Sequence, residues 1–330
     1  MSRRSAALPL TLVLVTLLVS AGYLALGRGP DAAATATAGP PPLPRSASTP
    51  GGDRAAAPAG TWRVGLPDGR SYLLAVPPGP ERAGRTVALP LLVVVHGRTS
   101  DAARFARTTR FTAYAETGRA VVVFPDATAP PGDKTSWNAG SCCRPAVLRG
   151  VDDVGYLQRV LADVRSRVAV DRVWYVGFSN GAMLGYRLAC EHPEMVDAVV
   201  AVAGSRVGKS CTPARSIPFL DVHGDADATV PLHGTPWSAR LHTALPSAFA
   251  AVGPLAAAAG CTGWTPVTSA EDDVSVRAGV GCRVPVGRVR ISGLSHHWDP
   301  RETPLAWSFL TSSRSSALLS PAAIMHVPST

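Results

Sequence analysis

The sequence predicts an α/β fold in which a mainly parallel, doubly wound sheet carries helices on both faces. Short apolar runs bounded by turn residues recur along the chain, and helical patterns lie between them. Runs such as residues 91–95 do not alternate between apolar and polar residues. Continuous apolar runs are typical of parallel strands that are buried on both faces. In such folds the loops at the carboxyl ends of the strands build the functional site.

The apolar runs predict eight strands. They lie at residues 62–66, 71–76, 89–95, 120–124, 173–177, 198–202, 219–222 and 289–291. The clearest helix begins near Asp152 and carries apolar residues three and four positions apart from Val154 to Val168. Asp152 and Asp153 stand where acidic residues cap a helix start, so capping is favoured over catalysis for both. A second helix follows residue 179 and ends before Pro193, because proline cannot continue it.

Composition divides the chain into four segments. Residues 1–27 hold arginines and then an apolar run long enough to span a bilayer, which predicts a signal peptide or a membrane anchor. Residues 28–60 are rich in Ala and Pro and predict a flexible linker. Residues 61–312 suit one folded domain, and residues 313–330 a flexible tail.

The charge is positive but scattered. The formal net charge is +9, from 32 basic and 23 acidic residues, and only Lys134 and Lys209 are lysines. No run of basic residues interleaves with aromatic residues, so a nucleic-acid partner is not expected. Contact with a membrane is expected only through the N-terminal segment, and the oligomeric state is left open.

Six cysteines predict an exported protein in an oxidising, extracytoplasmic compartment. They stand at positions 142, 143, 190, 211, 261 and 282. The best single disulfide pair is Cys261 with Cys282, because these two bracket a short polar segment before a strand. No cysteine or histidine pair has zinc-ligand spacing, so neither a metal site nor a cofactor is expected.

The segment from Gly177 to Gly181 reads G-x-S-x-G, with Ser179 at its centre. A β-prone run precedes it and a helical pattern follows, which is the context that a nucleophile elbow requires. Glycines let the strand and the helix approach closely, so Ser179 can be held in a strained turn with its hydroxyl exposed. The sequence therefore predicts a serine nucleophile.

A serine hydroxyl needs a base to take its proton and an acid to orient that base. Asp221, Asp225 and Asp227 compete for the acid. Asp221 lies inside its strand, whereas the other two lie beyond its carboxyl end, where the loop can turn back, and Asp227 is preferred. Asp225 is the second choice. His296 and His297 follow the last strand, and spacing alone does not choose between them.

An oxyanion formed during acyl transfer needs two preorganised donors. The backbone N–H groups of Arg98 and Asn180 are the candidates, since one follows an early strand and the other follows the nucleophile. His96 is expected to support the first of these turns through a hydrogen bond rather than to act as a base.

Seven motifs together resemble the secreted esterase family of polyhydroxybutyrate depolymerases and feruloyl esterases. They are His96-Gly97, Ser136-Trp137-Asn138, Val151 to Gly155, Gly177 to Met183, Arg187 to Glu191, His223-Gly224 with Asp227, and Gly293 with His296 and Trp298. The similarity covers about residues 61 to 312 and implies an α/β-hydrolase catalytic domain. It also implies Ser179 as nucleophile, Asp227 as acid and His296 rather than His297 as base. The sequence departs from the family at Arg98, where many relatives carry a smaller or less polar residue, and at Asp299.

The expected function is that of a secreted serine esterase acting by two-step acyl transfer on a small or polymeric ester. Trp137, Asn138 and Trp298 are expected to line the substrate cleft, although the two aromatic residues could equally be core. A non-catalytic envelope-binding relative and a serine peptidase are the alternatives. The acyl group and the alcohol are left open, with feruloyl, acetyl and 3-hydroxybutyryl esters all compatible.

Overall fold

The computed structural model describes residues 59–79, 81–82, 85–129, 133–271 and 273–313. The predicted signal or anchor segment, nearly all of the linker and nearly all of the tail lie outside these residues. Within them, no helix is both long enough and apolar enough to cross a bilayer.

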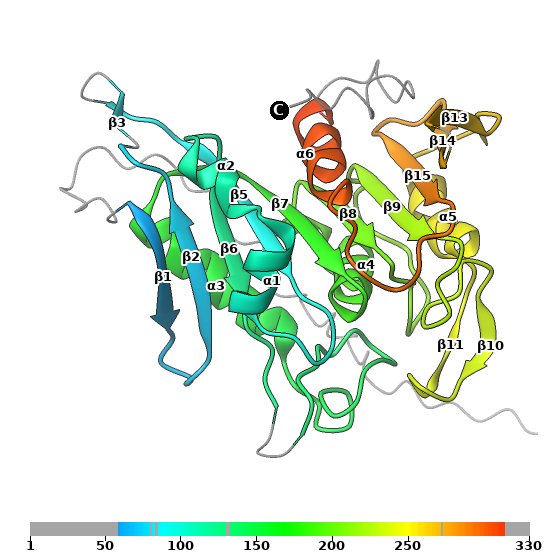
Figure 1. Ribbon diagram of the computed structural model, residues 1–330, viewed down its shortest axis with the longest axis horizontal. Helices are drawn as coiled ribbons and strands as arrows, with labels where there is room; N and C mark the ends of the chain where they lie inside the picture. The colour runs from blue at the N-terminus through cyan, green and yellow to red at the C-terminus, as the bar shows by residue number, and fades with distance from the viewer. Residues whose placement is uncertain (1–58, 80, 83–84, 130–132, 272, 314–330) are drawn as a thin grey trace, which may run out of the picture. The chain divides into compact units, whose positions relative to one another are not determined.

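The described residues form one large sheet of 11 strands, in the order β1-β2-β6-β5-β7-β8-β9-β15-β14-β12, with β13 paired to β14 (Figure 1). The strands are β1 (Gly60–Gly65), β2 (Ser71–Val76), β5 (Leu89–Val95), β6 (Val121–Pro125), β7 (Val170–Phe178), β8 (Ala198–Val202), β9 (Phe219–Gly224), β12 (Gly263–Trp264), β13 (Thr268–Glu271), β14 (Val274–Val280) and β15 (Val286–Ile291). The central strands, from β6 through β15, pair in parallel, and the outer strands pair antiparallel. The predicted parallel core of the sheet is confirmed.

Helices cover both faces of this sheet. One face carries α1 (Ala102–Thr109), α2 (Thr112–Glu116) and α6 (Glu302–Ser312), and the other carries α3 (Asp153–Arg167), α4 (Asn180–Glu191) and α5 (Ala248–Ala258) (Figure 1). The side chains of β5 divide between the two cores: Leu91, Val93 and Val95 pack on the α3 side, and Leu92 and Val94 on the α1 side. Successive side chains of a strand point to opposite faces, so an unbroken apolar run fills both cores.

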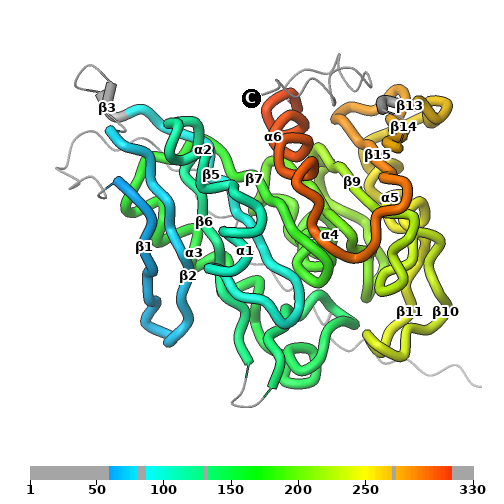
Figure 2. The backbone as a smooth tube through the Cα atoms, viewed as in Figure 1, coloured from blue at the N-terminus to red at the C-terminus, as the bar shows by residue number. Residues whose placement is uncertain are grey.

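The carboxyl ends of the parallel strands are in register. Val95 at the end of β5 pairs with Gly177 of β7, and Val202 at the end of β8 pairs with Val222 of β9. The loops that follow these strands therefore begin at the same edge of the sheet. In Figure 2 the segment that leads into α6 passes close to α4, although the two are far apart in sequence.

Strand boundaries differ from the prediction where a neighbouring strand extends the pairing. β7 begins three residues earlier than expected, at Val170, because it pairs there with Leu89. β15 begins at Val286, where it pairs with Phe219 of β9. The sequence did not predict several further elements. They are β3 (Glu81–Arg82), β4 (Arg85–Thr86), η1 (Pro193–Met195), β10 (Thr235–Ser238), β11 (Thr243–Leu245), β12, β13, β14, α1, α2, α5 and α6.

The two acidic residues at the start of α3 have different roles. Asp152 caps the helix, since its carboxylate accepts a hydrogen bond from the N–H of Gly155 at 2.8 Å. Asp153 is fully buried, forms a salt bridge to Arg70 at 2.8 Å and accepts a hydrogen bond from the N–H of Asn138. Burial raises the pKa of Asp153, although Arg70 and Asn138 oppose the shift. The capping prediction is thus confirmed for Asp152 and wrong for Asp153.

Three disulfides link the six cysteines: Cys142–Cys143, Cys190–Cys211 and Cys261–Cys282. The predicted pair of Cys261 with Cys282 is confirmed. Complete pairing of the cysteines fits an oxidising compartment.

Candidate active site

Ser179 occupies a strained turn between β7 and α4. Its backbone has φ +54° and ψ −118°, a conformation that residues other than glycine rarely adopt. A side chain at Gly177 would place its Cβ 2.4 Å from the carbonyl oxygen of Gly181, and one at Gly181 would lie 2.4 Å from that of Val95. The two glycines therefore permit the close crossing of β7, α4 and β5 that holds the serine at the sheet edge.

A continuous chain of hydrogen bonds joins Ser179, His296 and Asp227. The distance from Ser179 Oγ to His296 Nε2 is 2.8 Å, and that from His296 Nδ1 to Asp227 Oδ2 is 2.7 Å. A carboxylate only accepts, so Nδ1 carries the proton and Nε2 presents its lone pair to the hydroxyl. His297 is exposed and contacts Ser295 Oγ instead. The structure therefore brings His296, and not His297, to Ser179.

The second oxygen of Asp227 is held by the backbone. Oδ1 accepts hydrogen bonds from the N–H groups of Thr229 and Val230, both at 2.8 Å. Burial raises the pKa of Asp227, but the hydrogen bond and charge of His296, with the two backbone donors, outweigh it and leave the pKa below its usual range. Asp227 is therefore ionised at neutral pH.

The two competing aspartates have other partners. Asp225 accepts a hydrogen bond from the N–H of Gly293 at 2.7 Å and one from Ser292 Oγ, which fixes the loop that leads to His296. Asp221 is fully buried in β9 and accepts a hydrogen bond from the hydroxyl of Tyr186 at 2.8 Å. Asp227 is thus the one of the three that contacts His296.

His223 lies buried behind Asp227. Its Nε2 donates to the carbonyl oxygen of Val230 at 2.7 Å and is 3.7 Å from Asp227 Oδ2. Burial lowers the pKa of His223, but the carboxylates of Asp221 and Asp227 and the carbonyl of Val230 outweigh it and raise the pKa. The contact with Val230 holds the turn from which Asp227 projects.

The N–H groups of Arg98 and Asn180 lie on the two backbone segments that border Ser179. Asn180 is the first residue of α4, and Gly97 packs so closely that an added Cβ would lie 3.2 Å from Ser179 Cβ. Among the described residues neither N–H donates to an acceptor. His96 supports the turn, since Nδ1 donates to the carbonyl oxygen of Gly97 and Nε2 accepts from the N–H of Ala127. Burial lowers the pKa of His96, which keeps it neutral.

Two of the residues expected to line the cleft are core residues instead. Trp137 is fully buried, and its indole donates to the carbonyl oxygen of His96 at 2.8 Å. Trp298 is 7% exposed and packs edge-on against Phe105 and Phe111. Burial of a large aromatic ring stabilises the fold, and both rings are buried in the core rather than exposed in a cleft. The prediction that they line the cleft is corrected accordingly.

The third expected cleft residue, Asn138, orders its own loop. Its amide donates to the carbonyl oxygen of Val151, and its oxygen accepts from the N–H of Gly140. Asn138 is half-buried, and both polar ends of its side chain are occupied by backbone. These contacts give it a structural role.

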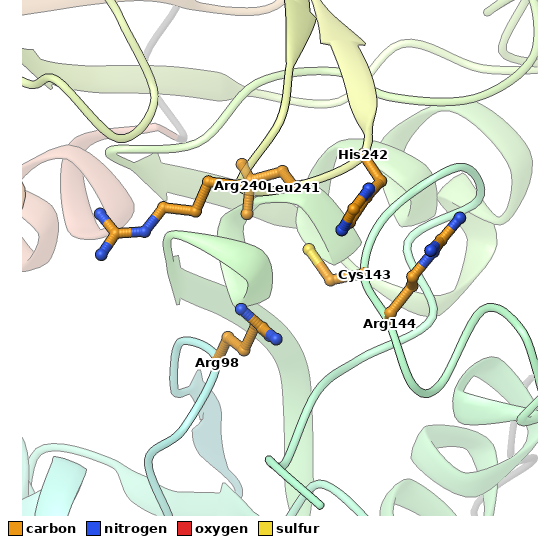
Figure 3. A pocket seen from close by; sticks show the side chains of 6 residues that line it. All are labelled: Arg98, Cys143, Arg144, Arg240, Leu241 and His242. Carbon is orange, nitrogen blue, oxygen red and sulfur yellow. The ribbon is translucent and has the colours of Figure 1, made fainter.

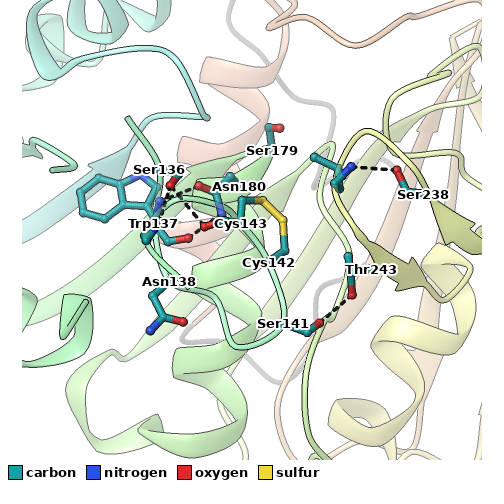
Figure 4. Close-up of a disulfide and its surroundings, with 12 residues drawn as sticks. Ser136, Trp137, Asn138, Ser141, Cys142, Cys143, Ser179, Asn180, Ser238 and Thr243 are labelled. Carbon is teal, nitrogen blue, oxygen red and sulfur yellow. Dashed lines mark hydrogen bonds between the residues drawn. A yellow bond between two sulfur atoms is a disulfide. The ribbon is translucent and has the colours of Figure 1, made fainter. Parts of the chain in front are cut away.

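Sequence reasoning missed the side chain of Asn180, which fastens a neighbouring loop to the site (Figure 4). The amide accepts from the N–H of Trp137 at 2.7 Å and donates to its carbonyl oxygen at 3.0 Å. The same carbonyl accepts from the N–H of Cys143, which is joined to Cys142 by a disulfide. An amide side chain directly after the nucleophile was the available signal, because it can pair with both backbone groups of one residue.

A cavity of about 200 Å³ lies between the loop that follows β5, the loop that precedes α3 and the turn between β10 and β11 (Figure 3). It is lined by Arg98, Cys143, Arg144, Arg240, Leu241 and His242. A wider depression of about 430 Å³ shares Arg98 and Arg144 with it. Sequence reasoning singled out Arg98 as a departure but missed Arg144 and Arg240. In the described part of the chain, no group of three or more His, Cys, Asp or Glu residues could hold a metal ion.

Two curated relatives align with part of the chain. "Putative esterase NocK" of Nocardia uniformis subsp. tsuyamanensis is 32% identical over 175 residues, which are 50% of this chain and 47% of the relative. "Probable feruloyl esterase C" of Aspergillus clavatus is 26% identical over 108 residues, 32% of this chain and 36% of the relative. The chain thus spans about half of the first and about a third of the second.

Solved structures share the fold at low identity. An acetyl xylan esterase from Aspergillus awamori matches with a TM-score of 0.53 and 13% identity, over 72% of this chain and 94% of its own. TT1662 from Thermus thermophilus matches with a TM-score of 0.52 and 17% identity, over 79% of this chain and 100% of its own. At such identity the likeness concerns the fold, and the chain has the α/β-hydrolase fold.

The family model "Esterase PHB depolymerase" matches residues 70–232, which include the segment around Ser179 and the turn that carries Asp227. The family model and both relatives carry the name of an esterase. The resemblance to the esterase family of polyhydroxybutyrate depolymerases and feruloyl esterases, which the sequence motifs predicted, is therefore confirmed.

Proposed function

We propose that the protein is a serine esterase that hydrolyses carboxylic esters through an acyl-enzyme formed on Ser179. The observation that carries this proposal is the chain of hydrogen bonds of 2.8 Å and 2.7 Å from Ser179 through His296 to Asp227. Nucleophile, base and acid lie on loops that follow three different strands, at the edge where sites form in such sheets.

In the first step Ser179 Oγ attacks the ester carbonyl carbon while His296 Nε2 accepts the hydroxyl proton. Asp227 stabilises the imidazolium that forms, and the N–H groups of Arg98 and Asn180 receive the negative charge on the carbonyl oxygen. Collapse of the intermediate expels the alcohol, which takes the proton from His296. Water then releases the acid by the same sequence of steps.

Location outside the cytoplasm belongs to the same proposal. The apolar N-terminal run predicts export, and the three disulfides support an oxidising compartment. The family match supports an ester as substrate, and the names of the relatives suggest testing acetyl and feruloyl esters together with 3-hydroxybutyryl esters.

Replacing Ser179 tests the mechanism. Ser179→Ala removes the nucleophile, so we expect turnover of p-nitrophenyl acetate to fall by about 10⁴- to 10⁶-fold. Ser166→Ala, at an exposed position on α3, is the matched control and should retain full turnover. A fluorophosphonate should label the wild type and the control but not Ser179→Ala. Undiminished turnover by Ser179→Ala would exclude the mechanism, and a folded wild type without labelling or turnover would favour a non-catalytic binder.

A further inference from the structure

The cavity of about 200 Å³ is strongly cationic. Three of its six lining residues are Arg98, Arg144 and Arg240, and the lining contains no acidic side chain. We propose that this cavity is a carboxylate-binding subsite, so that the preferred substrates are short esters that also carry a free carboxylate. The inference rests on the proposed esterase function and names its substrate class.

The cavity is connected to the candidate active site through the residues that support its lining. Arg98 follows Gly97, which packs against Ser179, and it supplies one of the two N–H groups proposed for the oxyanion. Cys143 donates to the carbonyl oxygen of Trp137, the same group to which the side chain of Asn180 is bound. Two residues of the cavity lining, Arg98 and Cys143, are therefore joined by backbone or hydrogen bonds to residues that surround Ser179.

Three separate loops supply the arginines. Arg98 follows β5, Arg144 precedes α3, and Arg240 stands in the turn between β10 and β11 (Figure 3). Arg240 is also tied to the turn that anchors Asp227, because its Nη1 donates to Thr229 Oγ1 at 3.0 Å. The fold thus holds three like charges around one small space, although like charges repel each other.

Many arginines in the described part of the chain pair with acidic side chains, and these three do not. Within the described residues none of the three forms a salt bridge, whereas Arg149, at the neighbouring depression, pairs with Asp133. The Nε of Arg98 is buried and has no hydrogen-bond partner among the described residues. A buried donor without a partner is rare in native structures, and an anion in the cavity would supply an acceptor.

The remaining lining residues suit the rest of such a ligand. Leu241 and Cys143 are buried and present apolar surface, while the guanidinium groups present planar pairs of donors that match a carboxylate. A space of about 200 Å³ holds a short chain of methylene groups with a terminal carboxylate, but not a long polymer segment. The chemistry points to esters of dicarboxylic acids or of hydroxy acids, in which the ester and the carboxylate are a few bonds apart.

The test compares each acid with its neutral amide. Monoethyl glutarate against ethyl glutaramate places the carboxylate on the acyl side, and O-acetyl-3-hydroxybutyrate against its amide places it on the alcohol side. We expect kcat/KM to be higher for the acid than for the amide in at least one pair. The pair that shows this preference identifies whether the carboxylate is recognised on the acyl side or on the alcohol side of the ester. In Arg144→Gln/Arg240→Gln the preference should fall about tenfold, as expected for the loss of two exposed charged contacts. Arg119→Gln/Arg165→Gln removes two exposed arginines outside the cavity and should leave the preference unchanged.

Salt provides a second readout. Raising the ionic strength from about 0.01 M to about 1 M shortens the Debye length from about 30 Å to about 3 Å, so the preference for the acid should shrink. The rate with the neutral amide should change little. Equal kcat/KM for acid and amide in both pairs, or a preference that the two cavity substitutions leave intact, would overturn the subsite.

Binding separates this inference from the catalytic one. Titration of monoethyl glutarate and of O-acetyl-3-hydroxybutyrate into Ser179→Ala should release heat with at least one of them, and the double cavity substitution in that background should abolish it. Hydrolysis of the neutral amides without acid preference would leave the esterase standing and remove the subsite. Binding of an acid without any hydrolysis by the wild type would support the subsite and exclude the esterase function. No binding of either acid by folded Ser179→Ala would count against the subsite.

Discussion

Asp227 uses its two carboxylate oxygens for different purposes. Oδ1 is anchored by the N–H groups of Thr229 and Val230, and Oδ2 faces His296. The anchored oxygen sets the direction of the free one, so the orientation of the histidine depends on a turn of only four residues. His223 supports this turn from behind through the carbonyl of Val230.

Asp227→Asn should keep the hydrogen bonds from Thr229 and Val230 but no longer hold His296 in its productive tautomer. The amide oxygen can still accept from the two backbone N–H groups, which turns the NH₂ group toward His296 Nδ1 and forces the wrong tautomer. We expect kcat to fall by about 10⁴-fold with KM little changed. Steady-state kinetics on p-nitrophenyl acetate checks this, and a loss below about tenfold would mean that the carboxylate does not orient His296.

The same substitution should alter the dependence of stability on pH. The folded-state pKa of Asp227 is lowered, so its ionisation stabilises the fold above the unfolded pKa, and this contribution is lost as the pH falls through the folded pKa. Urea unfolding from neutral pH into acid should show the wild type losing more stability than Asp227→Asn. Parallel curves for the two proteins would contradict the assigned pKa shift.

At the scale of elements, the site depends on the crossing of β7, α4 and β5. Gly177 and Gly181 meet backbone atoms closely enough to exclude any side chain. The hydroxyl of Tyr175 donates to the carbonyl oxygen of Gly181 at 2.6 Å, which ties the helix start to the strand that leads to it. The helix therefore cannot move outward to admit a methyl group without breaking this contact.

Gly181→Ala should destabilise the protein and distort the elbow. The added Cβ would lie 2.4 Å from the carbonyl oxygen of Val95, and overpacking of this kind costs about 1–3 kcal/mol. Gly253→Ala in α5 is the matched control, since nothing lies within 4 Å of its added Cβ and alanine favours a helix interior by about 0.5–1 kcal/mol. Urea unfolding should shift the two midpoints in opposite directions. A shift of both in the same direction would show that the crossing is not as tight as described.

At the scale of the whole molecule, the parallel sheet brings distant loops to one edge, and disulfides connect elements that support these loops. Cys190, near the end of α4, is joined to Cys211 in the segment before β9. The bond connects the helix that begins at Ser179 to the strand that precedes Asp227. It thus couples two of the three elements that support the site.

Removing this bond should lower stability without changing the chemistry. Cys190→Ala/Cys211→Ala frees a loop with a sequence separation of 21, and in the chain-entropy account the free energy of unfolding falls by about 3 kcal/mol. Denaturant titration of the oxidised wild type and the variant measures the difference. Well below the unfolding midpoint, kcat should be retained. Unchanged stability would mean that the native fold gains nothing from the bond.

Local patterns in the sequence determined much of the framework. Continuous apolar runs predicted the parallel strands, because a strand covered on both faces has no polar side. The glycines around Ser179 predicted the elbow, because a strand and a helix can cross so closely only where side chains are absent. Both signals lie within a few neighbouring residues, so one chain suffices to read them.

Only the tertiary structure decided how distant residues combine. Spacing left His296 and His297 open, and the hydrogen bond to Ser179 selects the first. The sequence left open whether Trp137 and Trp298 line a cleft or belong to the core, and both are buried, because burial depends on which elements cover a ring. The cationic cavity assembles arginines from three loops that no local pattern connects. A local pattern records what each segment can form, whereas contacts between loops exist only once the sheet has brought their strands together.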